Sequence, residues 1–221
     1  MIPAERDFLK GLRELCNDLG ALLIFDEVIT GFRLSPAGAQ QLYGVQPDLT
    51  IFGKIVGGGL PMGAIGGKAD VMQHMDHLKY SGRDFSFLGG TGVGNAMSVA
   101  AGYATLRKLE KEKPYHEIGR LGDRAREEIR DAFDRKGIPA ETTGVGSLFA
   151  CHFVEGKVRD VRAASAGNRE LSERLHLSML EKGIFYLTPH LFHAAISTAH
   201  SANDIDDLVA AVEAFARVAK H

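Results

Sequence analysis

Apolar residues recur along the chain with two different spacings, and each spacing predicts one kind of element. In residues 7–19 they return every three or four positions, which predicts a helix with one buried face, and Gly20 follows where a left-handed C-cap would end it. Residues 21–25 form a continuous apolar run of strand length, as in a parallel strand that is covered on both faces. Residues 49–52 predict a second strand of the same kind.

Glycine interrupts the pattern after the second predicted strand. Residues 55–67 contain too many glycines for a helix, so we expect a turn there and then a further strand around residues 63–66. Later helices are predicted over residues 95–111, 114–136, 168–182 and 205–219, and later strands over residues 146–154, 184–187 and 194–197. Ser201 and Asp204 have the spacing of a capping box at the start of the last helix.

The order of these elements predicts an α/β fold in two parts. Helices and strands alternate over residues 1–114, which is typical of a sheet covered by helices. Residues 115–221 carry long helices and short separate strands, which favours a smaller α+β domain.

Composition narrows the class of protein and its partners. With 221 residues, of which 45% are hydrophobic and 24% charged, the chain can bury a core and is not of disordered type. A net charge of −2 gives no reason to expect a nucleic-acid partner, and no apolar run approaches the ~20 residues that span a membrane. Cys16 and Cys151 lie far apart in apolar stretches, as free thiols in a reducing compartment do. We therefore expect a cytoplasmic protein that binds small molecules.

Two charged residues stand where the predicted strands end. Asp26 follows five apolar residues and Lys54 follows the second strand, and ligands of open α/β sheets collect at such carboxyl ends. A poorly solvated aspartate can pair with a cationic ring nitrogen, and a desolvated lysine has a lowered pKa and can attack an aldehyde. This pair is what pyridoxal phosphate needs. The alternative is that Asp26 caps a neighbouring helix and Lys54 is a solvated loop lysine.

Longer motifs carry a family resemblance. The segments LLIFDEVITGFR (residues 22–33), PDLTIFGKIVGGGLPMGAIGG (residues 47–67) and GGTGVGNAMSVAAG (residues 89–102) resemble the class III, fold type I aminotransferases, which depend on pyridoxal phosphate. Glutamate-1-semialdehyde aminomutase and β-amino-acid transaminases are members of this family. The resemblance extends over residues 187–206 and implies the C-terminal part of the large domain, a mostly parallel sheet between helices, followed by a small α+β domain.

The resemblance also implies roles for single residues. Lys54 matches the lysine that forms a Schiff base with the cofactor, and Asp26 matches the carboxylate that pairs with the pyridinium nitrogen. Val28 matches the residue that packs on one face of the ring. Gly90 and Thr91 match the turn that contacts the cofactor phosphate from the neighbouring subunit, which implies a homodimer with shared active sites.

The activity that this implies is transfer of an amino group from an amino donor to a keto or aldehyde acceptor. An intramolecular aminomutase and a non-catalytic fragment are the alternatives. The family has a further N-terminal half with no counterpart in these residues, so we expect activity only together with that half. The half belongs either to a longer chain of which these residues are a truncated part or to a complementing N-terminal chain. Without it parallel strands would be left uncovered, and we predict that the chain alone binds pyridoxal phosphate weakly or not at all.

Three histidines near the C-terminus invite comparison with a metal site. His190, His193 and His200 lie within eleven positions, but their segment alternates like strand and loop, and we expect no metal there. The charged run of residues 120–136 is typical of a solvated helix face, so neither a nucleic acid nor a membrane is expected as a partner.

Overall fold

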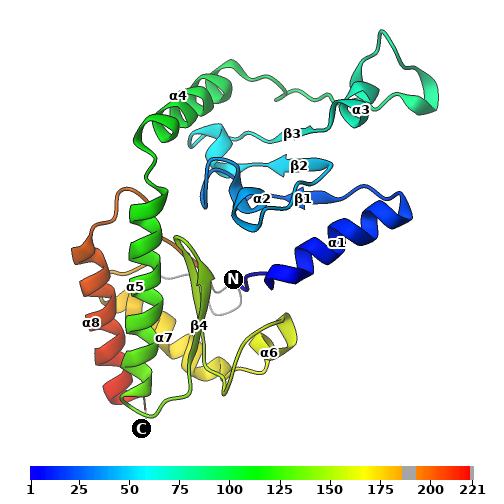
Figure 1. Ribbon diagram of the computed structural model, residues 1–221. Coiled ribbons are helices and arrows are strands. Elements are labelled where there is room, and N and C mark those ends of the chain that lie inside the picture. The colour runs from blue at the N-terminus through cyan, green and yellow to red at the C-terminus, as the bar shows by residue number, and fades with distance from the viewer. Residues whose placement is uncertain (186–192, 220–221) are drawn as a thin grey trace. The chain divides into compact units, whose positions relative to one another are not determined.

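The computed structural model describes residues 1–185 and 193–219. These residues form two compact units, one of residues 5–113 and one that joins residues 1–4 to residues 114–221 (Figure 1). Within the described residues, no helix combines the length and the apolar character that a membrane crossing requires.

The first unit is built on a three-stranded sheet. Helix α1 (Arg6–Leu19) leads into β1 (Ile24–Asp26), and the sheet continues through β2 (Leu49–Phe52) to β3 (Ala64–Gly67) in that spatial order (Figure 1). β1 and β2 run parallel with Asp26 opposite Ile51, whereas β3 returns antiparallel to β2, so the sheet is mixed. The predicted helix and its glycine C-cap are confirmed, because Gly20 adopts φ 63°.

Short helices and one long helix surround this sheet. They are α2 (Gly38–Tyr43), the 3-10 turn η1 (Lys54–Gly57), α3 (Ala69–Met72), the 3-10 turns η2 (Gln73–Met75) and η3 (Gly82–Asp84), and α4 (Ala96–Glu112). The sequence pattern predicted only α4 among these, and Asn95 caps it by accepting a hydrogen bond from the Ser98 amide. The others are too short for a periodic apolar pattern to emerge.

Burial in this unit differs from the expectation. No residue of α1 is buried, so the predicted buried helix face is wrong for the described residues. The apolar run of residues 21–25 yields only the short strand β1, and Leu22 and Ile24 remain 53% and 50% exposed. Ile51 and Ile65, which are register partners on β2 and β3, are exposed as well. The sheet therefore keeps one apolar face that the described residues do not cover.

The buried carboxylate of Asp48 connects several segments of the first unit, at the end of the sheet away from Asp26 and Lys54. Asp48 accepts hydrogen bonds from the Leu23 amide at 2.7 Å and from Arg13 at 2.6 Å, and it forms an ion pair with Lys68 at 2.6 Å. The hydrogen bonds from Lys68, Leu23 and Arg13 hold the pKa of Asp48 far below its usual range. Asp48 thus ties α1 to the starts of β1 and β2 and to the chain beyond β3.

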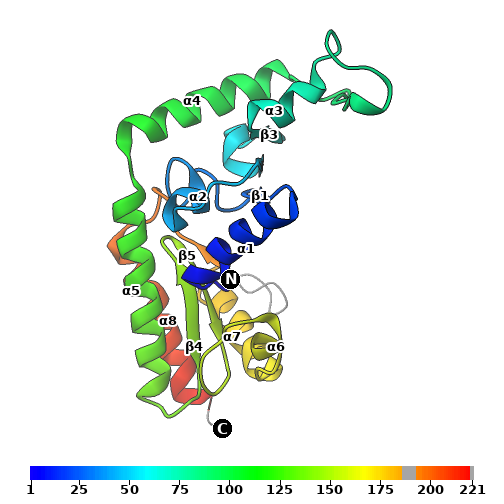
Figure 2. The same ribbon diagram turned by 45° about the vertical axis from the view of Figure 1, so that its right-hand side comes forward.

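The second unit packs helices on an antiparallel sheet. Its elements are α5 (Tyr115–Asp134), β4 (Glu141–Val145), β5 (Leu148–His152), α6 (Val161–Ser165), α7 (Arg169–Glu181), β6 (Ala194–Ala195) and α8 (Ala202–Val218). The sheet order is β4-β5-β6, and α5 and α8 lie side by side against it (Figure 2). Phe133, which is fully buried, contacts the rings of Phe153 and Phe215 edge to face at the centre of the core.

The strand predicted over residues 146–154 is wrong in its bounds. Residues 146 and 147 turn the chain between β4 and β5, so the segment is the second half of a hairpin whose first strand the pattern missed. Residues 184 and 185 are not strand, and the rest of the strand predicted over residues 184–187 lies outside the described residues. The capping box of Ser201 and Asp204 is confirmed at the start of α8.

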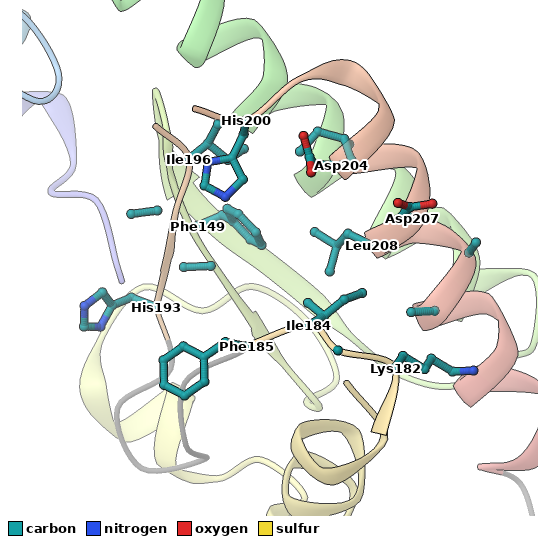
Figure 3. A pocket seen from close by; sticks show the side chains of 16 residues that line it. Phe149, Lys182, Ile184, Phe185, His193, Ile196, His200, Asp204, Asp207 and Leu208 are labelled. Atoms are coloured by element: carbon teal, nitrogen blue, oxygen red, sulfur yellow. The ribbon is translucent and has the colours of Figure 1, made fainter. Parts of the chain in front are cut away.

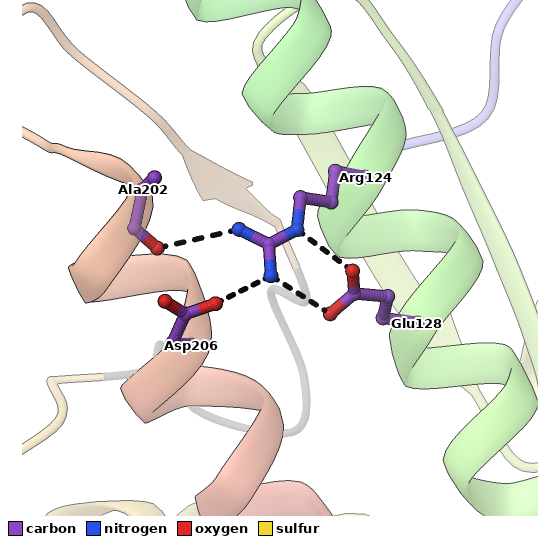
Figure 4. Close-up of polar contacts among 4 residues, drawn as sticks. All are labelled: Arg124, Glu128, Ala202 and Asp206. Atoms are coloured by element: carbon purple, nitrogen blue, oxygen red, sulfur yellow. Dashed lines mark hydrogen bonds and ion pairs between the residues drawn. The ribbon is translucent and has the colours of Figure 1, made fainter.

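Polar contacts join the two long helices of this unit at their surface. The guanidinium of Arg124 on α5 donates to Glu128 one turn along at 2.7 Å, to Asp206 on α8 and to the Ala202 carbonyl at 3.5 Å (Figure 4). The hydrogen bonds from Arg124 to Glu128 and Asp206 raise the pKa of Arg124 above its usual value. The fork geometry of arginine lets one side chain serve both helices.

Candidate active site

The predicted catalytic pair lies at one edge of the first sheet. Asp26 is the last residue of β1 and lies opposite Ile51 of β2, and Lys54 comes two residues after β2 ends at Phe52. Since β1 and β2 are parallel neighbours, their carboxyl ends meet at the same edge (Figure 1). The structure therefore brings the chain segments of Asp26 and Lys54 together, as the sequence predicted.

The carboxylate of Asp26 is oriented by its own turn. Its Oδ1 accepts a hydrogen bond from the Val28 amide at 3.0 Å, which directs the carboxyl group along the end of the strand. Asp26 is exposed, so the expectation of a poorly solvated carboxylate is wrong for the described residues. The alternative that Asp26 caps a helix is also wrong, because the neighbouring Glu27 caps α2.

Lys54 has an unusual backbone conformation. Its φ is 51°, in the left-handed region that residues with a Cβ seldom adopt, and it begins the 3-10 turn η1 directly after the extended Gly53. Such strain clusters at functional sites, where the surrounding structure holds it in place. The Lys54 side chain is exposed, so the burial that was expected to desolvate the amine is not supplied by the described residues.

Val28 packs against the backbone that precedes the lysine. A Cβ built on Gly53 would lie 3.1 Å from Cγ1 of Val28, which is tighter than ordinary van der Waals contact. Gly53 is buried and has no side chain, so it lets Val28 approach the residue next to Lys54. The turn after β1 and the turn after β2 are thus in direct contact.

The glycines that follow Lys54 serve the packing of this unit. A Cβ on Gly58 would lie 2.3 Å from the Ala101 carbonyl oxygen, and one on Gly102 would lie 2.1 Å from the Val56 carbonyl oxygen. The turn η1 therefore packs backbone to backbone against α4. The space beside Gly58 is thus filled by a helix of the same unit.

Gly90 and Thr91, the predicted phosphate-binding residues, lie in a different segment of the first unit from Asp26 and Lys54. Both are exposed in the turns before α4, where the Val93 amide donates to the Gly90 carbonyl at 3.1 Å. Among the described residues, no hydrogen bond or ion pair joins Gly90 or Thr91 to Asp26 or Lys54. Their predicted contact with a phosphate remains a prediction.

The second unit has a cavity of about 1010 Å³ that contains none of the predicted catalytic residues. Phe149, Ile184, Ile196 and Leu208 supply apolar lining, and His193 and His200 stand at its side (Figure 3). Two of the polar groups here have hydrogen-bond partners, because His200 Nδ1 accepts from the Ser197 amide at 3.1 Å and the Asp204 carboxylate accepts from the Ser201 amide at 2.7 Å.

Of the three histidines near the C-terminus, His193 and His200 lie among the described residues. Among residues 1–185 and 193–219, no group of three metal-ligating side chains gathers, and His190 lies outside that part of the chain.

Sequence reasoning missed one residue of the site region. Glu27 is buried at 1% exposure, although it stands beside the exposed Asp26. Strand alternation places Glu27 on the same face as the buried Leu23 and the half-buried Phe25, opposite to Asp26, but residues 21–25 are apolar at every position, so the pattern does not tell which face is buried.

Comparison with known proteins gives the family. The profile of the aminotransferase class-III family matches residues 1–213. Glutamate-1-semialdehyde 2,1-aminomutase from Desulforamulus reducens is 44% identical over 222 residues, which cover 100% of this chain and 50% of that protein. A β-phenylalanine aminotransferase from Variovorax paradoxus superposes with a TM-score of 0.88 at 37% identity, over 97% of this chain and 48% of that one. A structure described as a transaminase with PLP bound gives a TM-score of 0.82 at 31% identity, over 98% and 48%.

These matches bear on the fold and on the extent of the chain. The solved relatives confirm the expected fold class, the α/β fold of pyridoxal-phosphate-dependent transaminases. The chain spans about half the length of the curated relatives that it matches, at 50% of the aminomutase named above. Because the profile matches residues 1–213, the chain belongs to the aminotransferase class-III family.

Proposed function

We propose that this chain binds pyridoxal phosphate at the edge formed by Asp26 and Lys54 and acts in amino-group transfer. The observation that carries the proposal is the strained, left-handed Lys54 next to Asp26 at the carboxyl ends of two parallel strands. The exposed carboxylate and amine are open to a ligand, and they suit a cofactor with a cationic ring nitrogen and an aldehyde. When bound, pyridoxal phosphate supplies an electron-accepting ring that lets a bond at the substrate Cα break.

Each residue of the edge has a defined task in this proposal. The Asp26 carboxylate, oriented by the Val28 amide, holds a proton on the ring nitrogen and keeps the ring electron-poor. The Lys54 amine would hold the cofactor by condensing with its aldehyde group with loss of water, and, once a substrate amine displaces it, the freed amine would take and return the proton at Cα. The Val28 side chain, which rests on Gly53, supports one face of the ring.

Two reactions fit these tasks. One is transfer between an amino donor and a separate keto or aldehyde acceptor, as in the similar β-phenylalanine aminotransferase. The other is an intramolecular aminomutase reaction, which is favoured by the 44% identity to an enzyme named for it. A requirement for an external keto or aldehyde acceptor distinguishes the first reaction from the second.

The proposal includes further chain around the site. The exposed sheet face at Ile24 and Ile51 suits packing against the remaining half of the family fold. The exposed turn at Gly90 and Thr91 suits contact with the cofactor phosphate of a second subunit. We therefore propose that the active form is a homodimer that also contains this half, or a complementing N-terminal chain. A non-catalytic fragment is the alternative. A cytoplasmic location stays a prediction from the free cysteines.

An absorbance titration with pyridoxal phosphate, followed by borohydride reduction and peptide mass mapping, tests the assignment of Lys54. We expect the label on Lys54 and its loss in Lys54→Ala, while Lys10→Ala, which removes an exposed helical lysine, keeps it. The titration is run on the 221-residue chain with and without the N-terminal half of a relative, and an amino-donor screen follows on the form that binds. Equal labelling of Lys10 and Lys54 would overturn the assignment, and full binding by the chain alone would overturn the need for a complement.

A further inference from the structure

Glu27 is a buried carboxylate that nothing above uses in the reaction. It directly follows Asp26, yet its side chain points into the first unit and is only 1% exposed. There it accepts hydrogen bonds from the amides of Ala39 and Gln40, each at 2.8 Å, and from the hydroxyl of Thr30. A buried charge is stable only where donors surround it, so these contacts fix the position of the carboxylate.

The contacts join two segments that are separate in sequence. Ala39 and Gln40 lie in the first turn of α2, and Thr30 lies in the turn after β1. Gly38 completes the fit, because a Cβ there would lie 2.2 Å from Oε2 of Glu27 and its φ is 70°. The start of α2 is therefore shaped around this carboxylate.

The backbone of Glu27 is held as firmly as its side chain. Its amide donates to the Ile51 carbonyl of β2 at 2.9 Å, and its carbonyl accepts from the Gly31 amide at 2.8 Å. Asp26 stands immediately before these anchor points, and Val28, whose amide orients the Asp26 carboxylate, stands immediately after them. The orientation of Asp26 thus depends on a turn whose position Glu27 determines.

We propose that Glu27 is a positioning residue, whose buried carboxylate clamps the turn after β1 to the start of α2 and thereby fixes the Asp26 carboxylate and Val28. The proposal rests on the proposed function, in which Asp26 meets the ring nitrogen of pyridoxal phosphate. Glu27 does not contact the cofactor in this scheme. It acts through the Asp26–Val28 hydrogen bond.

Glu27→Gln tests the clamp with the least change of shape. A carboxylate accepts at both oxygens, whereas the amide keeps one acceptor and turns an NH₂ group toward donors. An unsatisfied buried donor destabilises the contact, so the start of α2 separates from the turn. Gly38→Ala disturbs the same contact from the other side, and Thr30→Val removes only the hydroxyl donor and serves if the other two variants fold poorly.

Amide hydrogen exchange measures the clamp without any cofactor. In Glu27→Gln we expect faster exchange at whichever of the Ala39 and Gln40 amides meets the NH₂ group in place of an oxygen. We also expect faster exchange at Val28, which Glu27 does not touch through its side chain. Asp48→Asn is the matched control, because Asp48 is a buried carboxylate at the opposite end of the same strands. It should lower stability and leave Val28 exchange at the wild-type rate once global opening is subtracted.

Cofactor binding supplies the second readout. In the form that binds pyridoxal phosphate, Glu27→Gln should weaken binding by roughly tenfold and change the absorbance spectrum of the bound cofactor, while Asp48→Asn should leave the spectrum unchanged. Unchanged Val28 exchange together with an unchanged spectrum in Glu27→Gln would overturn the proposal. If neither the wild-type chain alone nor its complex with the N-terminal half binds the cofactor, the proposed function fails, and the exchange at Val28 still decides whether Glu27 positions the turn.

Discussion

The left-handed backbone of Lys54 makes a prediction about stability that is independent of any cofactor. At φ 51° a residue with a Cβ clashes with its own carbonyl, whereas glycine does not. Replacing Lys54 by Ala removes the side chain and keeps the strain, and replacing it by Gly removes both. The difference between the two variants therefore isolates the backbone term.

The magnitude follows from two opposing contributions. Left-handed strain costs about 1–2 kcal/mol, and the extra freedom of glycine in the unfolded chain costs about 0.5–1 kcal/mol. Lys54→Gly should thus be more stable than Lys54→Ala by about 0.5–1 kcal/mol, which corresponds to roughly a threefold slower exchange of the amides that open with the unit. The amides of β1 and β2 report it, measured by exchange mass spectrometry on the whole chain.

Lys10 gives the matched control for this pair. It is an exposed lysine within α1, and there Ala should be more stable than Gly by about 1 kcal/mol, so the sign reverses. Lys54→Ala proving as stable as Lys54→Gly, with the Lys10 pair behaving as expected, would refute the strain at Lys54. Both Lys54 variants should also lose the borohydride-stable cofactor label.

Three further predictions concern packing and protonation. Burial lowers the pKa of His152 to about 4, so the stability that the neutral imidazole contributes is complete above its ordinary pKa of 6.5 and is lost as the pH falls toward 4. The urea midpoint of the wild type should therefore drop over this pH range more than that of His152→Gln, and parallel curves would contradict this. Phe133→Ala should lower the free energy of unfolding of the second unit by about 3–5 kcal/mol, because its ring is fully buried. Phe185, whose ring is 81% exposed, is the control: Phe185→Ala should change the urea midpoint little, and equal effects would count against the core assignment. Gly102→Ala should displace η1 and lower the melting temperature, whereas Gly119→Ala, whose Cβ makes only ordinary contacts, should raise the melting temperature slightly. A higher melting temperature in Gly102→Ala would contradict the close packing of η1 and α4.

The sequence predicted those features that local chemistry decides. The helix periodicity of residues 7–19, the glycine cap at Gly20 and the capping box at Ser201 all depend on neighbouring residues and appear in the structure. The two short apolar runs predicted the strands β1 and β2. Because these strands pair in parallel, Asp26 and Lys54 lie at the same end of the sheet. The family motifs added the expected cofactor, because they are long and stand in order along the chain.

Burial could not be predicted from the same pattern. An apolar run predicts that a face will be covered, but the covering element can lie elsewhere, and here Leu22, Ile24 and the α1 face remain uncovered by the described residues. The hairpin of β4 and β5 was missed for a related reason, since the first strand, which contains two threonines and a glycine, lacks the continuous apolar run that the second strand has.

By itself the sequence determined the longer helices, the strands that precede Asp26 and Lys54, the family and the candidate pair of Asp26 and Lys54. Only the tertiary structure decided which carboxylate of the Asp26–Glu27 pair faces outward and which is buried, because that choice depends on the donors that α2 brings from residues 39 and 40. It likewise decided that Lys54 is strained and that η1 packs on α4 at Gly102. These properties arise from contacts between segments distant in sequence, and the spacing of residues along the chain does not encode them locally.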